Sequence, residues 1–175
     1  MKIIEGLKKT KDLLRKADDI RSKLALHCAD LDAEKPAYET VEIQKKQIAD
    51  WLQMHSDILK EIERLRLAIQ RTNLVATVTV EVVDGTYVEK TIAAWIHRRK
   101  DLSKLEATAW NALTNRGLRP QNYRPSPTSD EMKIANIRKY YDQQERDKKV
   151  EDFTSEPLRI DAALEIANAT TDLME

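Results

Sequence analysis

The sequence predicts an α+β, mostly α protein, in which long antiparallel helices form a coiled-coil-like bundle with an inserted β-hairpin. Three observations predict this fold: two long segments with heptad-like apolar spacing, one segment with an apolar period of two, and a composition poor in glycine. The 175 residues include only three glycines, and 34% of them are charged. Average proteins contain about 7% Gly and about 25% charged residues, so this composition favours helices.

The first predicted helix begins at Lys2 and reaches Asp32. Its apolar residues recur at steps of three to four and are Ile3, Leu7, Leu14, Ala17, Leu24, Cys28 and Leu31, and the stripe is widened by Ile4, Leu13 and Ile20. This spacing is typical of an amphipathic helix with a heptad-like seam. We expect Pro36 to end the helix, because proline cannot donate a helical hydrogen bond.

The second predicted helix restarts near Thr40 and carries the strongest periodicity of the chain. Its seven-residue series is Val41, Ile48, His55, Ile62 and Ile69, with Trp51, Ile58 and Leu65 at the intermediate positions. With a short connector, the two helices are expected to form an antiparallel hairpin over residues 2–72. We interpret His55 as a partly buried residue that sets the register, with a buried switch or ligand as the alternative.

A β-hairpin is predicted over residues 75–91, where the apolar period changes to two. Val78, Val80 and Val82 alternate with Thr77, Thr79 and Glu81 before the pair Asp84–Gly85. An Asp-Gly pair between alternating runs indicates a two-residue type I′ turn, which would set Val82 opposite Tyr87 and Val80 opposite Glu89. Since a lone hairpin is marginally stable in water, we expect residues 132–141 to add a third antiparallel strand, with a helical turn as the alternative.

The remaining segments complete a single predicted domain, 1–175. A third helix over 92–116 is expected to end at Gly117, which suits the left-handed C-terminal position. A Pro-rich loop, 117–129, follows. The last segment, 132–173, combines the strand with a C-terminal helix that Asp142 caps. Pro157 is expected to kink this helix or to restart it, with Ser155 as the new N-cap.

Charge and cysteine usage exclude several classes of protein. Lys and Arg total 30 and so do Asp and Glu, so we expect no nucleic-acid partner. The longest stretches without charge, 72–80 and 107–115, are far shorter than a membrane-spanning helix, and the charged N-terminus does not resemble a signal peptide. We therefore expect a cytoplasmic or virion location. The single cysteine, Cys28, excludes an intramolecular disulfide, and we interpret it as a small core residue rather than a nucleophile.

No catalytic or metal-binding motif is visible in the sequence. It lacks a Gly-rich phosphate loop, a nucleophile elbow and an HxxxH or HExxH pair, and His27 and His97 lie on separate segments. We predict no enzymatic activity, no cofactor and no metal. The basic run 97–101 is interpreted as a solvated helix face with a local pair between Arg98 and Asp101.

The β-hairpin and the Pro-rich loop are the predicted contact elements. The hairpin offers valine and tyrosine side chains, and the loop offers tyrosine and arginine, which are common anchors in protein interfaces. The residues proposed for this contact are Val83, Tyr87, Arg116, Arg119, Tyr123 and Arg124.

Three stretches together resemble the septicolysin-like family of small bacterial and phage proteins. They are IleGlnArgThrAsn at 69–73, the AspGly pair with the Arg-rich helix at 91–102, and the tail 160–173. The tail matches the family's ending at Asp161, Asn168, Thr170, Thr171, Asp172 and Leu173. It departs from that ending at Ala169, where relatives often carry Trp, and at Pro157.

The resemblance implies a pore-forming protein, by the family's name. Strands 75–83 and 86–92 are at best nine and seven residues long, whereas a membrane β-strand needs about 9–11 residues, so this function is kept as an alternative. A polar motif of Thr72, Asn73, Asn168, Thr170 and Thr171 allows two interpretations, a small-molecule or catalytic site and a set of helix-end caps. The capping interpretation is preferred.

The function expected from the sequence is a non-enzymatic structural or assembly protein. Apolar seams on long helices often leave surface that only self-association buries. We therefore expect a homo-oligomer or a partner of other virion or scaffold proteins, such as a phage virion component or a cytoplasmic scaffold. The oligomer number and the partner are not fixed by the sequence.

Overall fold

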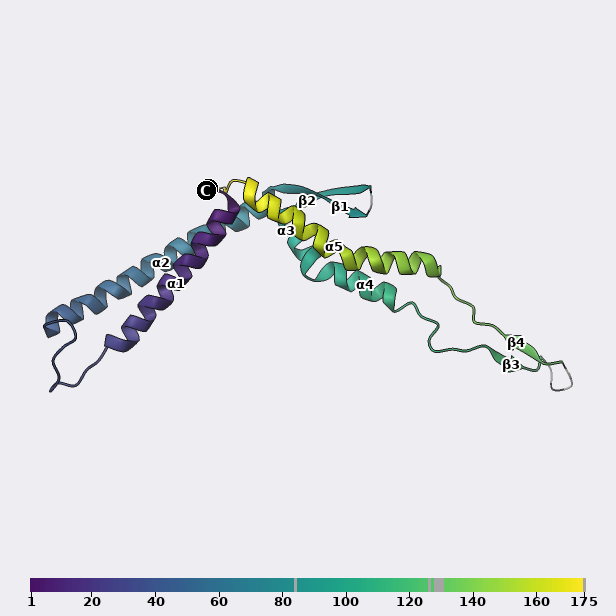
Figure 1. The fold of residues 1–175 in the computed structure, drawn as a ribbon, viewed down its shortest axis with the longest axis horizontal. Coiled ribbons are helices and arrows are strands. Elements are labelled where there is room, and N and C mark those ends of the chain that lie inside the picture. Colours follow the sequence, from purple (N-terminus) through teal and green to yellow (C-terminus); the bar gives the residue numbers. More distant parts are fainter. Residues whose placement is uncertain (84, 126, 128–130, 175) are drawn as a thin grey trace. The chain divides into compact units, whose positions relative to one another are not determined.

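The structure, a computed structural model, describes residues 1–83, 85–125, 127 and 131–174. Its long helices are α1 (Ile3–His27), α2 (Val41–Val75) and α5 (Gln143–Thr170), and the shorter ones are α3 (Ile92–His97) and α4 (Ser103–Asn111), joined by a π-helical turn, η1 (Arg98–Leu102). The strands are β1 (Thr77–Val83), β2 (Thr86–Thr91), β3 (Gln121–Tyr123) and β4 (Lys133–Ala135). Figure 1 shows these elements. The predicted α+β, mostly α class is confirmed.

The chain divides into two compact units. The first comprises Met1–Val78, Thr91–Ala93 and Leu164–Glu175, and the second comprises Thr79–Lys90 and Ala94–Ala163. The prediction of one domain over 1–175 stays a prediction.

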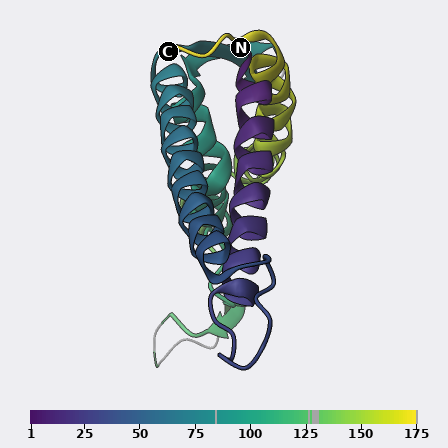
Figure 2. The same cartoon turned by 90° about the vertical axis from the view of Figure 1, so that its left-hand side faces the viewer.

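The first unit is dominated by the antiparallel pair α1 and α2 (Figures 1 and 2). The predicted register of α2 is confirmed over most of its length, since Trp51, Ile62, Leu65 and Ile69 are buried and His55 is half-buried. Val41, the first residue of α2, is the exception because it is exposed.

The predicted stripe of α1 is confirmed at Ile3, Ala17 and Ile20 but is wrong at Leu7 and Leu14. Its buried residues are Ile3, Gly6, Thr10, Ala17 and Ile20, whereas the predicted seam residues Leu7 and Leu14 are exposed. Glycine and threonine fill two inward positions, and the Thr10 hydroxyl is satisfied because it donates to the Gly6 carbonyl at 2.8 Å. An apolar pattern alone therefore misses Gly6 and Thr10 and selects Leu7 and Leu14, which lie beside the seam.

Helix α1 ends at His27, before the predicted end at residue 32 and well before Pro36. The Gln44 amide donates to the His27 carbonyl at 3.0 Å and thereby satisfies one of the last helical acceptors. Asp30 and Asp32 follow, and acidic residues are unfavourable at a helix C-terminus. The N-terminus of α2 agrees with the prediction, because the Thr40 hydroxyl accepts from the Ile43 amide at 3.2 Å.

The predicted β-hairpin is present as the β1–β2 pair. Gly85 adopts φ +76°, a conformation that favours glycine, but Asp84 lies outside the described residues, so the turn type and the predicted pairing stay predictions. The expected third strand does not join this sheet. Strand β4 pairs antiparallel with β3 instead, with Asn122 opposite Ile134, so the Pro-rich loop itself supplies the partner strand.

The segment predicted as one helix over 92–116 is interrupted and shorter. It runs through α3, η1 and α4 and ends at Asn111. Gly117 has the expected positive φ, +71°, but it belongs to a separate turn in which its amide donates to the Asn115 side-chain oxygen at 3.2 Å. The short polar side chain of Asn115 thus forms a turn of its own beyond the helix.

Helix α5 starts as predicted, because the Asp142 carboxylate accepts from the Glu145 amide at 2.8 Å. It then continues through Pro157, so of the two predicted outcomes, a kink or a restart, the restart is wrong. Ser155 lies within the helix and donates to the Asp152 carbonyl at 3.1 Å rather than capping a new helix. Glu156 and Ile160, on either side of Pro157, are both buried, and their packing favours the continuous helix over a break.

The Lys9–Glu61 pair links α1 to α2 at 2.7 Å, and Arg64 bonds the same carboxylate at 2.9 Å. Hydrogen bonds from Arg64 and Lys9 lower the pKa of Glu61 to about 2. Because the pKa of Glu61 is lower in the folded protein than the unfolded value near 4.5, its ionised carboxylate stabilises the fold at pH values above 4.5. This stabilisation is lost as the pH falls toward 2.

We predict that Glu61→Gln costs less than about 1 kcal/mol at pH 7 and reduces the loss of stability between pH 4.5 and 2. Urea unfolding at several pH values measures both effects, and an unchanged pH profile would contradict the assignment.

Candidate functional sites

The N- and C-terminal segments of the first unit bind each other. The Ile3 amide donates to the Thr171 carbonyl at 3.0 Å, and the Leu173 amide donates to the Met1 carbonyl at 2.8 Å. Figure 2 shows the tail, in yellow, crossing from the start of α1 to the end of α2. We call residues 1–3 with 171–174 the terminal clasp.

Charge and packing both support the terminal clasp. The Lys2 ammonium donates to the Thr170 carbonyl at 2.7 Å and to the Asp172 carboxylate at 2.8 Å, and this second bond holds the pKa of Asp172 below its ordinary value. Leu173 is buried beside Gly6, where an added Cβ would lie 2.7 Å from the leucine Cδ1 atom. Glycine at this position therefore lets the tail approach α1 closely.

Most of the polar motif predicted from the sequence lies at or beside the terminal clasp. The buried Thr72 hydroxyl donates to the Ala68 carbonyl at 2.8 Å and accepts from the Met174 amide at 2.9 Å. The Thr170 hydroxyl donates to the Ile166 carbonyl at 2.9 Å. Asn73 and Asn168 are half-buried, as is Thr171. The hydroxyls of Thr72 and Thr170 thus bond backbone groups, as helix-end threonines commonly do.

The predicted contact residues all belong to the second unit. Tyr87 is 65% exposed and Tyr123 on β3 is 48% exposed. The three predicted contact arginines are exposed. They are Arg116, just before the Pro-rich loop, and Arg119 and Arg124 within it. Val83 is half-buried and lines a cavity, so it is a less suitable surface residue than the sequence indicates.

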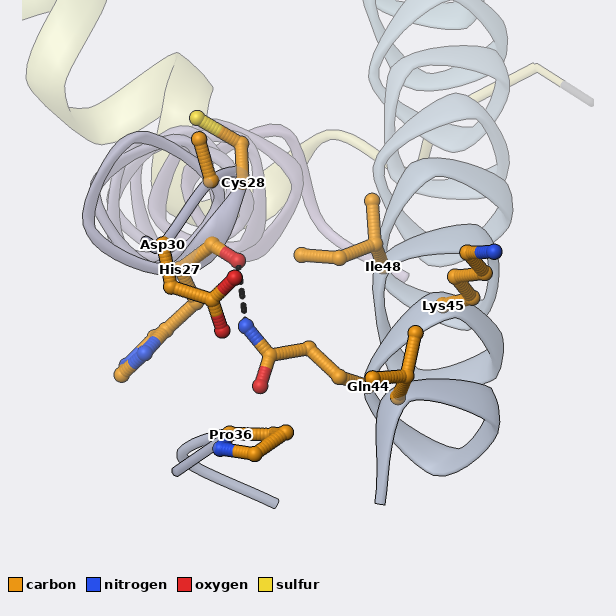
Figure 3. Close-up of a pocket in the computed structure, with 9 residues that line it drawn as sticks. His27, Cys28, Asp30, Pro36, Gln44, Lys45 and Ile48 are labelled. Carbon is orange, nitrogen blue, oxygen red and sulfur yellow. Dashed lines mark hydrogen bonds between the residues drawn. The ribbon is translucent and has the colours of Figure 1, made fainter. Parts of the chain in front are cut away.

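A cavity of about 260 Å³ lies at the tip of the α1–α2 pair. Figure 3 shows Gln44 reaching from α2 to the His27 carbonyl, with Pro36 and Asp30 beside it. Cys28 lines this cavity and is exposed, so the prediction that it is a core residue is wrong. Helix α1 ends earlier than predicted, so that Cys28 is its C-cap residue and no further helical turn follows it.

Three rings hold the connector between α1 and α2 in place. The His27 ring centroid lies 5.4 Å from Tyr38 and 5.8 Å from Trp51, and Tyr38 lies 5.7 Å from Trp51. Such edge and tilted contacts stabilise aromatic pairs. His27 thus has a packing role at the hairpin tip.

Neither a metal site nor a membrane span is found in the part of the chain that the structure describes. Within residues 1–83, 85–125, 127 and 131–174, no group of three or more His, Cys, Asp or Glu residues is arranged to hold a metal ion. Over the same residues, no helix is both long and apolar enough to cross a bilayer.

The second unit contains a buried ion pair that the sequence does not reveal. The Arg98 Nε donates to both carboxylate oxygens of Glu156, at 2.9 and 3.0 Å, and the Arg98 Nη1 donates to Glu106. Glu156 is only 3% exposed. The two carboxylates raise the pKa of Arg98, and the arginine lowers the pKa of Glu106. The sequence interpretation of Arg98 as a solvated residue paired with Asp101 is therefore wrong, because its partners are Glu106 and Glu156.

The π-helical turn η1 positions this ion pair. The Ser103 amide donates to the Arg98 carbonyl across the widened turn. The Ser103 hydroxyl donates to Glu156 at 2.7 Å. Such turns are rare in proteins overall, but those that occur often lie at functional sites. Here the turn brings Arg98 and Ser103, five residues apart, to the same carboxylate.

An exposed apolar strip lies along one side of the α1–α2 pair. Leu7 and Leu14 are 46% and 40% exposed and line a groove with Arg66 of α2. Leu59 and Leu52 lie seven and fourteen residues before Arg66, so they share its side of α2, and they are also exposed. We call Leu7, Leu14, Leu52 and Leu59 the apolar hairpin face.

Comparison with known proteins identifies a similar fold and no family. No family model and no curated protein matches this sequence. A solved structure, described as a functionally unknown conserved protein from Corynebacterium diphtheriae, matches with a TM-score of 0.54 and 21% sequence identity over 99% of each chain. This similarity covers both units and shows the fold.

We predict that Thr72→Val lowers the free energy of unfolding by about 1–2 kcal/mol, because the part-buried hydrogen bond from the Met174 amide loses its acceptor. Thr170→Val removes an exposed hydroxyl and serves as the control, with a change below about 0.5 kcal/mol. Urea unfolding followed by circular dichroism measures both values. Equal stability of the two variants would show that the Thr72 hydroxyl does not hold the tail.

A second pair of variants tests the buried ion pair. Glu156→Ala leaves Arg98 with a single carboxylate partner and is expected to cost about 3 kcal/mol. Asp161→Ala, on the same helix, breaks the exposed pair with Arg99 and is expected to cost less than about 1 kcal/mol. Thermal unfolding of the two variants side by side gives the difference, and similar costs would contradict the assigned role of Glu156.

Proposed function

We propose that this protein is a non-enzymatic assembly protein whose α1–α2 pair associates with a second copy of the chain. The observation that supports the proposal is the apolar hairpin face, on which Leu7, Leu14 and Leu59 are 46%, 40% and 47% exposed beside a buried seam. Two packed helices form a single layer, and a layer buries only the stripe that faces inward. Stable helical folds cover further apolar surface with another layer.

The opposite side of the same helices supports this choice of face. It carries the pair of Lys9 and Glu61, with Arg64 on the same carboxylate. Charged side chains at these positions interact well with water and with each other. The contrast between the two sides favours association through the apolar hairpin face.

The available area matches a stable dimer. Helix α1 has 25 residues, which at about 1.5 Å per residue gives a length of about 37 Å. Two helices packed about 8–10 Å apart present a width of about 20 Å, so one face covers about 700 Å². Two such faces total about 1,500 Å², within the roughly 1,200–2,000 Å² of specific interfaces.

Charge complementarity favours a second copy as the occupant. The formal net charge of the chain is zero, so two copies do not repel each other at long range. Lys11 and Arg66 border the groove, and Asp18 and Glu63 follow Leu14 and Leu59 by four residues on the same helix sides. A two-fold axis can bring these basic and acidic groups of the two copies together.

The proposal extends to the expectations from the sequence. The exposed Tyr87 and the loop arginines, such as Arg119, are kept as further contact residues, because anchors of this kind are frequent in interfaces. Membership of the septicolysin-like family is likewise proposed, on the motif residues quoted above. A phage virion component and a cytoplasmic scaffold would both use such self-association.

The test is the native mass of the protein by light scattering over a hundredfold range of concentration. We predict a species of twice the 20.2 kDa chain mass. Leu14→Glu and Leu59→Glu are each expected to weaken dimerisation at least tenfold, because a charge would be buried in the interface. Leu26→Glu is the matched control, since Leu26 is exposed on α1 but lies about 120° around the helix from Leu14.

Circular dichroism confirms that each variant is folded before its mass is compared. A wild-type monomer at every concentration would overturn the proposal. A dimer that both glutamate variants leave unchanged would place the interface elsewhere and would also overturn it.

A further inference from the structure

The second unit contains a small cavity between its β-hairpin and α5. Its volume is about 180 Å³, and its lining residues are Val82, Val83, Val88, Lys90, Arg98, Asp152, Phe153 and Glu156. We propose that this cavity binds a small organic ammonium ion, with the Asp152 carboxylate as its acceptor. The proposal is independent of self-association, because the cavity and the apolar hairpin face use different residues.

The Asp152 carboxylate lacks a partner for one of its oxygens. Its Oδ2 atom is buried and accepts no hydrogen bond from any residue that the structure describes. Removing an ionised carboxylate from water is costly unless a donor or a cation compensates it. Buried polar atoms without a partner are rare in folded proteins, so this oxygen indicates a missing donor.

The two cations that line the cavity are engaged elsewhere. The Arg98 guanidinium is held by Glu156 and Glu106. The Lys90 ammonium lies 4.9 Å from the centre of the Trp95 ring, a favourable cation–π distance. Neither gives a hydrogen bond to Oδ2 of Asp152, and the open acceptor therefore suits a cation from outside the chain.

The chemistry of the lining favours an ammonium ion over a metal ion. Both oxygens of Glu156 already accept from Arg98, and one also accepts from Ser103. This leaves Asp152 as the available carboxylate, whereas Mg²⁺ and Ca²⁺ require several oxygen ligands. An ammonium group needs fewer acceptors, because its N–H donors can also bond water.

The walls and volume of the cavity limit the ligand to a short one. Val82, Val88 and Phe153 provide apolar surface for an alkyl group. A water molecule occupies about 30 Å³ in the liquid, so the cavity has the volume of about six waters. Pockets for drug-sized ligands begin near 300 Å³, and a short primary alkylammonium ion is therefore the fitting class.

The experiment is a titration of the full-length protein with ethylammonium chloride, followed by backbone amide NMR at constant ionic strength. We expect saturable shifts at Val82, Val88 and Phe153, with millimolar affinity. Tetramethylammonium, which has no N–H donor, is expected to bind at least tenfold more weakly, and sodium to give no saturable shift. These comparisons use the wild-type protein and do not depend on the folding of any variant.

Two variants test the role of Asp152 directly. Asp152→Asn keeps the shape but removes the charge and is expected to weaken ethylammonium binding at least tenfold. Asp161→Asn, an exposed acid on the same helix, should leave the affinity unchanged. The proposal is overturned by an absence of saturable shifts, by equal binding of ethylammonium and tetramethylammonium, or by unchanged affinity in a folded Asp152→Asn protein.

Discussion

The buried Glu156 carboxylate constrains the second unit more than any other single group. A carboxylate that is 3% exposed has to be compensated fully, and Arg98 and Ser103 do so together. Both donors reach it because the π-helical turn shifts the register between α3 and α4. Glu156 directly precedes Pro157, so the same pairing fixes α5 where proline weakens the helix. Asp152, one helical turn before Glu156, lines a cavity together with Glu156 and Arg98.

In the first unit the governing constraint is that two helices bury only one stripe each. Small or self-satisfied residues, Gly6 and Thr10, occupy the inward positions of α1 near its start. The absence of a side chain at Gly6 lets Leu173 of the terminal clasp pack against the helix, and the inward positions of Gly6 and Thr10 leave Leu7 and Leu14 at the edge of the seam. The close attachment of the tail and the exposed apolar strip therefore have the same origin in the sequence.

The features that the sequence predicts well are those set by neighbouring residues. The start of α2 near Thr40, the cap at Asp142, the register of α2 and the β-hairpin each depend on residues that are close in the sequence. The inward positions of α1 at Gly6 and Thr10 are not predicted, because these residues carry no apolar signal. The partner of β4 was also missed, since pairing between distant strands depends on the tertiary fold.

The candidate sites could be predicted less well, for a related physical reason. Arg98 lies 58 residues from Glu156, and in the sequence it resembles an ordinary solvated arginine. Asp152 likewise has no distinguishing neighbours, and only the burial of its Oδ2 atom marks it. Whether a charged side chain is buried depends on tertiary packing and not on the local sequence. In a chain with many surface acids, the few buried ones therefore do not stand out in the sequence. In such a helical protein, a charged group that is buried away from solvent is therefore a useful guide to a functional site.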